Sequence, residues 1–129
     1  MGDALGKLVL RLGLGAMMIP HGWAKLSNLI STRQFSFLDP IGIGVEASLL
    51  GTIFAEFFCA TLIVLGYKTK LASIPLAFTM LVAAVIVHAE DPFAKKEFAL
   101  LYFTGFVALL LLGGGKYSLD HWVSSKKYE

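Results

Sequence analysis

Ionisable side chains interrupt the most apolar stretches of this sequence. Six of them lie within such stretches or at their ends: Arg11, His21, Lys25, Glu46, Glu56 and His88. Glu97 and Tyr102 lie at the start of the last apolar stretch. Imidazole and carboxylate groups transfer protons, and lysine and arginine donate hydrogen bonds to oxygen atoms. Together, these side chains could bind the oxygens of a small molecule and exchange protons with it.

The composition indicates what surrounds these residues. The chain has 129 residues, of which 57% are hydrophobic and 16% are charged, with a mean hydropathy of +0.74. A soluble domain is usually about 45–50% apolar and about 25% charged, so this chain lacks the charged residues of a soluble surface. The net charge is only +2 and the basic residues form no stripe, which excludes a nucleic-acid-binding protein. The single cysteine, Cys59, excludes an internal disulfide.

The apolar stretches predict four transmembrane helices, at about residues 5–26, 43–67, 70–89 and 96–113. A helix that crosses a bilayer needs about 20 apolar residues. The stretch from residue 98 to 112 is apolar on every side, so a helix formed by it needs lipid around it. We therefore predict an all-α membrane protein with one domain over residues 1–129 and an antiparallel four-helix bundle. A polar segment is expected between the first two helices, and it either leaves the membrane or lies on its surface, where it could form a short interfacial helix.

The distribution of lysine and arginine predicts the orientation of this bundle. With four spans, both termini and the turn near residue 68 lie on one side of the membrane. That side carries more basic residues: Lys7, Lys68, Lys70, Lys116, Lys126 and Lys127. By the positive-inside rule, we expect a multi-pass protein of the cell membrane with both termini in the cytoplasm.

Helical periodicity places the ionisable residues on inward faces. At 100° per residue, Arg11, His21 and Lys25 fall within an arc of roughly 80°. Glu46 and Glu56 share a similarly narrow arc on the second helix. Because an ionisable group in contact with lipid is costly, we expect both stripes to face the interior of the bundle.

The depth of each residue suggests which of them meet. Arg11 lies about 15 Å deeper than His21, and Glu56 about 15 Å deeper than Glu46. Arg11 and Glu56 could therefore pair, or Arg11 could extend to the cytoplasmic headgroups. Five residues are expected to converge at the outer mouth of the bundle: His21, Lys25, Glu46, His88 and Glu97. Two histidines fall short of a metal site, so we expect none.

Four motifs in order resemble the DoxX family of small four-helix membrane proteins. The first is RLGLG at residues 11–15 followed by HGWAK at 21–25. The second is Ala55-Glu56 leading to LGYKTK at 65–70, and the third is His88 at the end of the third helix. The fourth is GGGKYSLD at 113–120, in which Gly114 and Lys116 replace the more usual proline and arginine. Lysine keeps the positive charge but lacks the planar guanidinium fork.

This resemblance implies a membrane protein linked to respiratory or redox systems. Our main hypothesis is a quinone-interacting subunit of a membrane oxidoreductase, with catalytic roles for His21, Lys25, Glu56 and His88. The substrate-binding residues would be Arg11, Glu46, Glu97 and Tyr102. The sequence has no flavin, haem or iron–sulfur motif, so we expect no intrinsic cofactor. Electrons would then come from a soluble or membrane redox partner protein.

Two alternatives remain open at this stage. The chain could be a non-catalytic scaffold or assembly partner, in which the charged stripes only specify the bundle. It could also be a conduit for protons or a small molecule. Four short helices leave little room for a pore, so a conduit would require a homo-oligomer.

Overall fold

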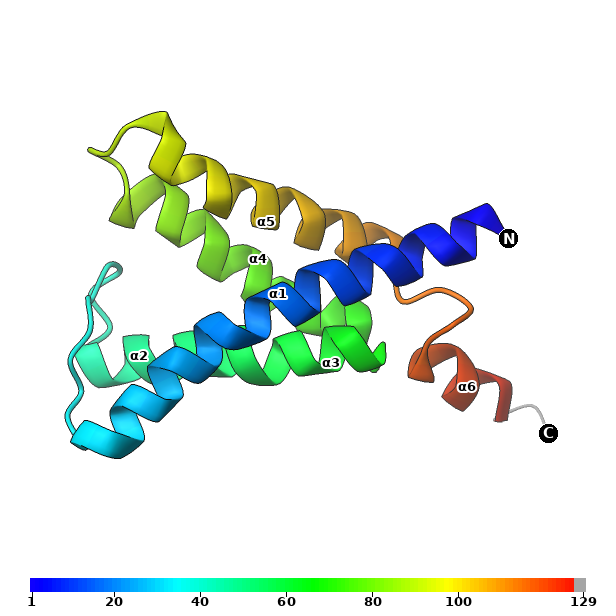
Figure 1. Ribbon diagram of the computed structural model, residues 1–129, viewed down its shortest axis with the longest axis horizontal. Helices are drawn as coiled ribbons and strands as arrows, with labels where there is room; N and C mark the ends of the chain where they lie inside the picture. Colours follow the sequence, from blue (N-terminus) through cyan, green and yellow to red (C-terminus); the bar gives the residue numbers. More distant parts are fainter. Residues whose placement is uncertain (127–129) are drawn as a thin grey trace.

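The computed structural model describes residues 1–126, and over that range all regular structure is helical. The predicted all-α class is therefore confirmed for these residues, while Lys127, counted above among the basic residues, lies outside them. The helices, shown in Figure 1, are α1 (Gly2–Thr32), α2 (Val45–Ile53), η1 (Phe54–Cys59), α3 (Ala60–Leu65), α4 (Thr69–Val82), η2 (Ala83–Val87), α5 (Phe93–Leu112) and α6 (Leu119–Lys126). The two η segments are π-helical.

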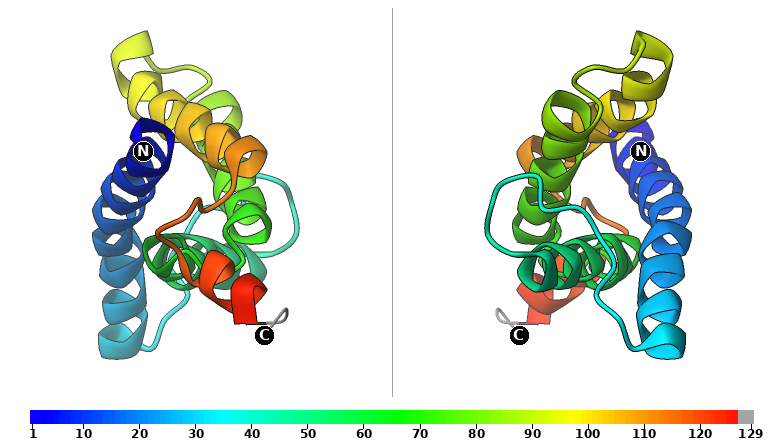
Figure 2. Two further views of the ribbon diagram at one scale, coloured as in Figure 1. Left: turned by 90° about the vertical axis from the view of Figure 1, so that its right-hand side faces the viewer. Right: turned by 90° about the vertical axis from the view of Figure 1, so that its left-hand side faces the viewer.

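The helices form a bundle that is tighter at one end than at the other. The segments α2, η1 and α3 follow one another without a break, as do α4 and η2. Helix α5 packs along α4, and α1 packs on α3 and η1. Figure 1 shows that α2 and the η2 end of α4 diverge on the left, whereas both termini lie on the right. Helix α6 lies at this right-hand end, which Figure 2 shows from both directions.

Two glycines of α1 let this helix pack closely against the continuous stretch formed by α2, η1 and α3. A Cβ atom placed on Gly22 would lie 2.5 Å from the Phe57 nitrogen and 2.6 Å from the Glu56 carbonyl carbon. A Cβ on Gly15 would lie 3.0 Å from the Ala60 carbonyl oxygen. Small residues allow this approach of helix backbones, which is a common means of helix association in membranes.

The first helix is longer than predicted, and the interfacial helix is absent. Helix α1 continues to Thr32, and Arg33 ends it in the left-handed conformation with φ of 55°. The polar residues after Lys25 remain helical because the backbone hydrogen bonds of a helix do not require apolar side chains. In the last turn, Thr32 Oγ1 also donates to the Asn28 carbonyl at 2.8 Å. Residues 33–44 form an irregular connection, so the polar segment between the first two helices is present but the option of an interfacial helix is wrong.

Two of the helical stretches are long and apolar enough to cross a membrane, Val45–Leu65 and Thr69–Val87. Helices in the core of a soluble protein can pass the same test, but such helices are mostly buried. Here less than half of each stretch is buried inside the protein. Large apolar side chains are exposed on α1, α2, α4 and α5 alike, including Leu12, Leu50, Phe78 and Leu101. This extent of exposed apolar surface is rare in soluble monomers and fits a protein surrounded by lipid.

Candidate functional site

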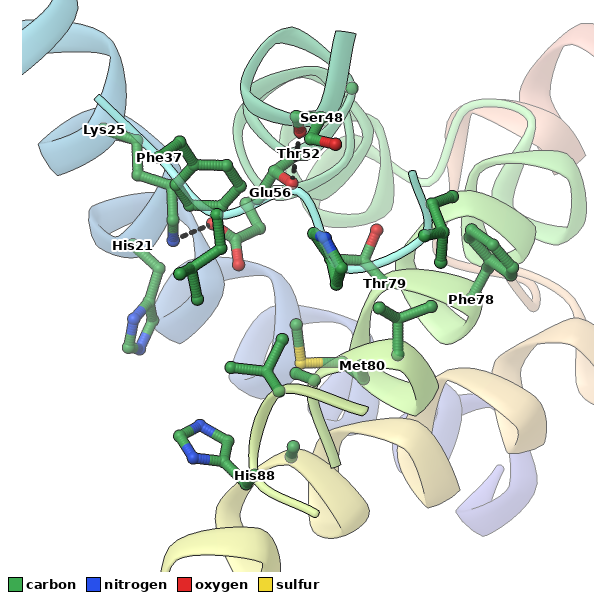
Figure 3. A pocket seen from close by; sticks show the side chains of 18 of the residues that line it. His21, Lys25, Phe37, Ser48, Thr52, Glu56, Phe78, Thr79, Met80 and His88 are labelled. Atoms are coloured by element: carbon green, nitrogen blue, oxygen red, sulfur yellow. Dashed lines mark hydrogen bonds and ion pairs between the residues drawn. The ribbon is translucent and has the colours of Figure 1, made fainter. Parts of the chain in front are cut away.

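A pocket of about 380 Å³ lies where the helices diverge. Its walls come from α1, the connection 33–44, α2 with η1, α4 with η2, and the first turns of α5. Figure 3 shows side chains that surround it. The polar ones are His21, Lys25, Ser48, Thr52, Glu56, Thr79 and His88, and most of the remaining wall is apolar. A small number of polar groups in an apolar wall is typical of small-molecule sites, and this volume lies within their usual range.

An ion pair between α1 and η1 forms one wall of the pocket. Lys25 Nζ lies 2.5 Å from Glu56 Oε2, and the side chain of Glu56 is only 7% exposed. A carboxylate this deeply buried needs a charged partner or a proton. Lys25 is this charged partner. It can reach Glu56 because Gly22, one turn before Lys25, lets α1 touch the backbone at Glu56. Glu56 also lies in the π-helical segment, and π-bulges often occur at functional sites.

A histidine–aspartate pair lies at the outer edge of the pocket. His88 follows η2, and its Nδ1 donates to Asp91 Oδ2 at 2.7 Å. This hydrogen bond is the main reason that the pKa of the Asp91 carboxyl lies below its ordinary value of 3.8. Because Nδ1 is engaged, Nε2 is the ring nitrogen that can act on a molecule in the pocket. The arrangement of an imidazole held by a carboxylate is common among acid–base catalysts.

Aromatic rings surround the other histidine. The ring of His21 lies edge-on to Tyr102, with centroids 6.2 Å apart, and to Phe98 at 6.1 Å. Tyr102 is 7% exposed and stacks on the fully buried Phe106. Figure 3 shows the rings of His21 and His88 on the same side of the pocket.

The predicted pair between Arg11 and Glu56 is wrong. Arg11 is 2% exposed and donates to four main-chain carbonyls, those of Ile63, Val64, Gly114 and Tyr117, at 2.8–3.1 Å. These bonds are at the end of the bundle near the termini, and they also exclude the alternative in which Arg11 reaches the headgroups. The depth estimate ended the first helix near residue 26. Because α1 in fact continues to Thr32, Lys25 and not Arg11 lies level with Glu56.

The structure thus separates the eight predicted site residues into two groups. His21, Lys25, Glu56, His88 and Tyr102 all line the pocket. Arg11 lies at the opposite end, and Glu46 and Glu97 are exposed and lie outside the pocket wall. The predicted convergence therefore includes His21, Lys25 and His88 but not these two glutamates. The functional roles assigned to the residues stay predictions.

Several polar groups at the pocket were not identified from the sequence. Asp91 is one of them, although a carboxylate three residues after a histidine is within reach of its ring. The hydroxyl groups of Ser48, Thr52 and Thr79 line the pocket, yet isolated Ser and Thr in apolar helices gave no distinctive pattern. Ser48 Oγ donates to Asp39 Oδ1 at 3.0 Å, which joins α2 to the 33–44 connection.

The fold and the pocket define a small helical membrane protein with a polar site between its helices. The DoxX family model matches residues 6–89, which is more than half of the chain, and the chain belongs to this family. It is a multi-pass protein of the cell membrane.

Two relatives match nearly the whole chain. It is 27% identical to "Inner membrane protein YqjF" of Escherichia coli (strain K12), with 96% of each chain covered. It is 28% identical to "Putative oxidoreductase CatD" of Bacillus subtilis (strain 168), with 95% of this chain and 90% of the relative covered. No solved structure matches.

Proposed function

We propose that four helical stretches cross the membrane as one antiparallel bundle and one domain. These are α1, the stretch from α2 to α3, the stretch from α4 to η2, and α5. The first and last carry charged residues, but the charges deep in α1 are satisfied internally, by the carbonyls around Arg11 and by Glu56 at Lys25. Both termini lie in the cytoplasm in this proposal, because the basic residues of the short connections favour that side.

We propose that the pocket binds the headgroup of a quinone and that the chain is the membrane subunit of a quinone-linked oxidoreductase. The observation that supports this most is the meeting of the Lys25–Glu56 pair and the His88–Asp91 pair at one apolar pocket. A quinone offers two carbonyl oxygens that accept hydrogen bonds and become hydroxyls on reduction. Lys25 can donate to such an oxygen, Nε2 of His88 can do so when the imidazole carries both ring protons, and the apolar wall suits the ring.

The residues of the pocket would bind the headgroup and deliver protons. Reduction of a quinone to a quinol takes up two electrons and two protons. His88, with Asp91 holding its ring, and Glu56, with Lys25 beside it, are the acid–base groups on the pocket wall. The electrons would come from a soluble or membrane redox partner protein, because this chain provides no redox motif. The name of the Bacillus subtilis relative, "Putative oxidoreductase CatD", agrees with this class of reaction.

A quinone titration of the purified protein tests this proposal. The protein has two tryptophans, so a Trp122→Phe background leaves Trp23, which packs on Phe57 beside the Lys25–Glu56 pair. We expect a short-chain quinone to quench Trp23 fluorescence with a saturable response. Loss of a charge-assisted hydrogen bond is worth about 1.5–3 kcal/mol. The double variant Lys25→Met/Glu56→Gln, which leaves no unpaired buried charge, should therefore bind about 10- to 100-fold more weakly, and His21→Ala should also bind more weakly.

The matched control is Glu97→Gln, since Glu97 is exposed and does not line the pocket. It should leave the affinity unchanged. An absent response in the parent protein, or equal affinities in the pocket variants and the control, would contradict quinone binding. If the pocket variants lost only thermal stability, the alternative of a non-catalytic scaffold would be favoured.

A further inference from the structure

Lysine side chains from three elements gather at the end of the bundle opposite the pocket. Residues 113–115 are three glycines that connect α5 to the segment before α6. A Cβ atom on Gly113 would lie 3.1 Å from Cε of Lys70, and one on Gly115 would lie 3.0 Å from Cδ of Lys7. The side chains of Lys7 and Lys70 therefore lie against the glycine segment, and Lys116 follows it directly. A bulkier segment would keep these side chains apart.

Two acidic groups near this cluster offset part of its charge. Asp3 pairs with Lys7 at 3.1 Å. Asp120 accepts hydrogen bonds from the Lys68 amide at 2.6 Å and the Thr69 amide at 2.9 Å, and its negative charge remains. The buried Arg11 adds a positive charge beneath the same segment, because it donates to the carbonyl oxygens of Gly114 and Tyr117. Lys70 and Lys116 therefore keep this end of the protein positive after Asp3 offsets Lys7 and Asp120 offsets Arg11.

Helix α6 adds Lys126 and an exposed aromatic surface to this end of the bundle. It is fixed to the bundle by Asp120, whose amide also donates to the Gly66 carbonyl at 2.8 Å. Trp122 is 53% exposed, and the Lys126 ammonium lies 4.3 Å from the centroid of its ring. Tyr117 is 44% exposed and precedes the helix. Aromatic rings beside lysines are typical of segments in the headgroup layer of a membrane.

We propose that this end of the protein binds the phosphate groups of anionic phospholipids. Helix α6 lies in the headgroup layer through Trp122, and the lysine cluster formed by Lys7, Lys70 and Lys116 contacts the phosphates. A lipid surface is the partner because the helices next to this end expose apolar side chains such as Leu71 and Leu111 to acyl chains. Anionic headgroups complement the charge of the cluster, whereas zwitterionic headgroups do not. This proposal does not depend on quinone binding at the other end.

Quenching by brominated lipids measures which lipids surround Trp122. A Trp23→Phe background makes Trp122 the single tryptophan, and it keeps an aromatic ring against Phe57. The full-length protein is reconstituted in vesicles that contain the same fraction of either brominated phosphatidylglycerol or brominated phosphatidylcholine. We expect the anionic quencher to be more effective by at least about twofold, since each lysine near the surface favours anionic lipid. In Lys70→Gln/Lys116→Gln, the advantage of the anionic quencher should fall markedly, and only Lys7 and Lys126 would still favour anionic lipid there.

The control removes the same number of charges at the other end of the bundle, with Arg33→Gln/Lys96→Gln. It should keep the preference of the parent protein for the anionic quencher. Equal quenching in the parent protein would overturn the proposal, as would the same loss of preference in both double variants. Replacement of chloride by inorganic phosphate at constant ionic strength should leave the preference intact. If phosphate abolished it, the cluster would bind free phosphate and not lipid.

Discussion

A methyl group at Gly22 should disturb both the packing and the pocket of this protein. The Cβ atom of Gly22→Ala would lie 2.5 Å from the Phe57 nitrogen and 2.8 Å from its Cβ. Ordinary contacts of a Cβ atom begin near 3.4 Å, so α1 must move away from η1 by about 1 Å. The obstructing atoms belong largely to the backbone, so a change of rotamer cannot relieve the contact. Overpacking of this kind costs about 1–3 kcal/mol.

The same movement should loosen the Lys25–Glu56 pair, because Lys25 is one turn from Gly22 on α1. At 2.5 Å the pair is in direct contact, and a displacement of about 1 Å exceeds the range of a strong hydrogen bond. We therefore expect a lower melting temperature and a weaker response to quinone in Gly22→Ala. Thermal unfolding in detergent measures the first effect, and quenching of Trp23 in the Trp122→Phe background measures the second.

Gly13→Ala is the matched control, since it makes the same change within the same helix. A Cβ at Gly13 would meet only the terminal methyl carbon of Met17, at 3.9 Å. It should leave quinone binding unchanged and stabilise the protein by about 0.4–1 kcal/mol, because alanine restricts the unfolded chain. If Gly22→Ala melted at the same temperature as Gly13→Ala, the close contact between α1 and η1 would not exist as described.

Three further predictions concern the ends of the bundle. Arg11→Met should lower stability by about 3 kcal/mol or more, since it leaves four carbonyls without their donor, and limited proteolysis should then cut the released C-terminal segment. Asp120→Asn should lower stability by about 1 kcal/mol in thermal unfolding, because it weakens the cap on α4. Asp91 has a lowered pKa, so its bond to His88 stabilises the protein above pH 3.8 and is lost as the pH falls through the folded value. Asp91→Asn should therefore remove part of the acid sensitivity in melting curves recorded at decreasing pH.

The sequence predicts a helical stretch well where residues that end or precede helices lie on both sides of it. The predicted helix at 70–89 corresponds closely to the stretch Thr69–Val87, because a turn at Gly66, with φ of 74°, precedes it and Pro92 follows it. The end of α1 had no comparable signal. Its polar last turns continue the helix without contributing to an apolar pattern.

The partners of the charged residues could not be predicted, since they depend on how one helix is placed along another. A face assignment at 100° per residue assumes a regular α-helix. The π-helical segment η1 winds with a wider turn, so residues on either side of it no longer share the face that the sequence spacing suggests. Glu46 lies in the first turn of α2 and is exposed, whereas Glu56 lies within η1 and is buried against α1, so the two do not share a buried face. Neither the π-helical turn nor the backbone contact at Gly22 has a recognisable sequence signature.

The two ends of the bundle meet opposite physical requirements. At the end near the termini, Arg11 and Asp120 satisfy backbone groups from three segments. At the other end the helices diverge, and polar side chains line a pocket instead of being covered. The hydrogen bonds of Arg11 and Asp120 hold the fold at the first end, so we expect the open end to retain buried charge without loss of the fold. Substitutions should therefore separate into two classes: those at Arg11 or Asp120 should change the free energy of unfolding, and the paired substitution at Lys25 and Glu56 should chiefly change ligand affinity. If the variants at both ends lowered the free energy of unfolding and the ligand affinity to the same extent, this division would be refuted.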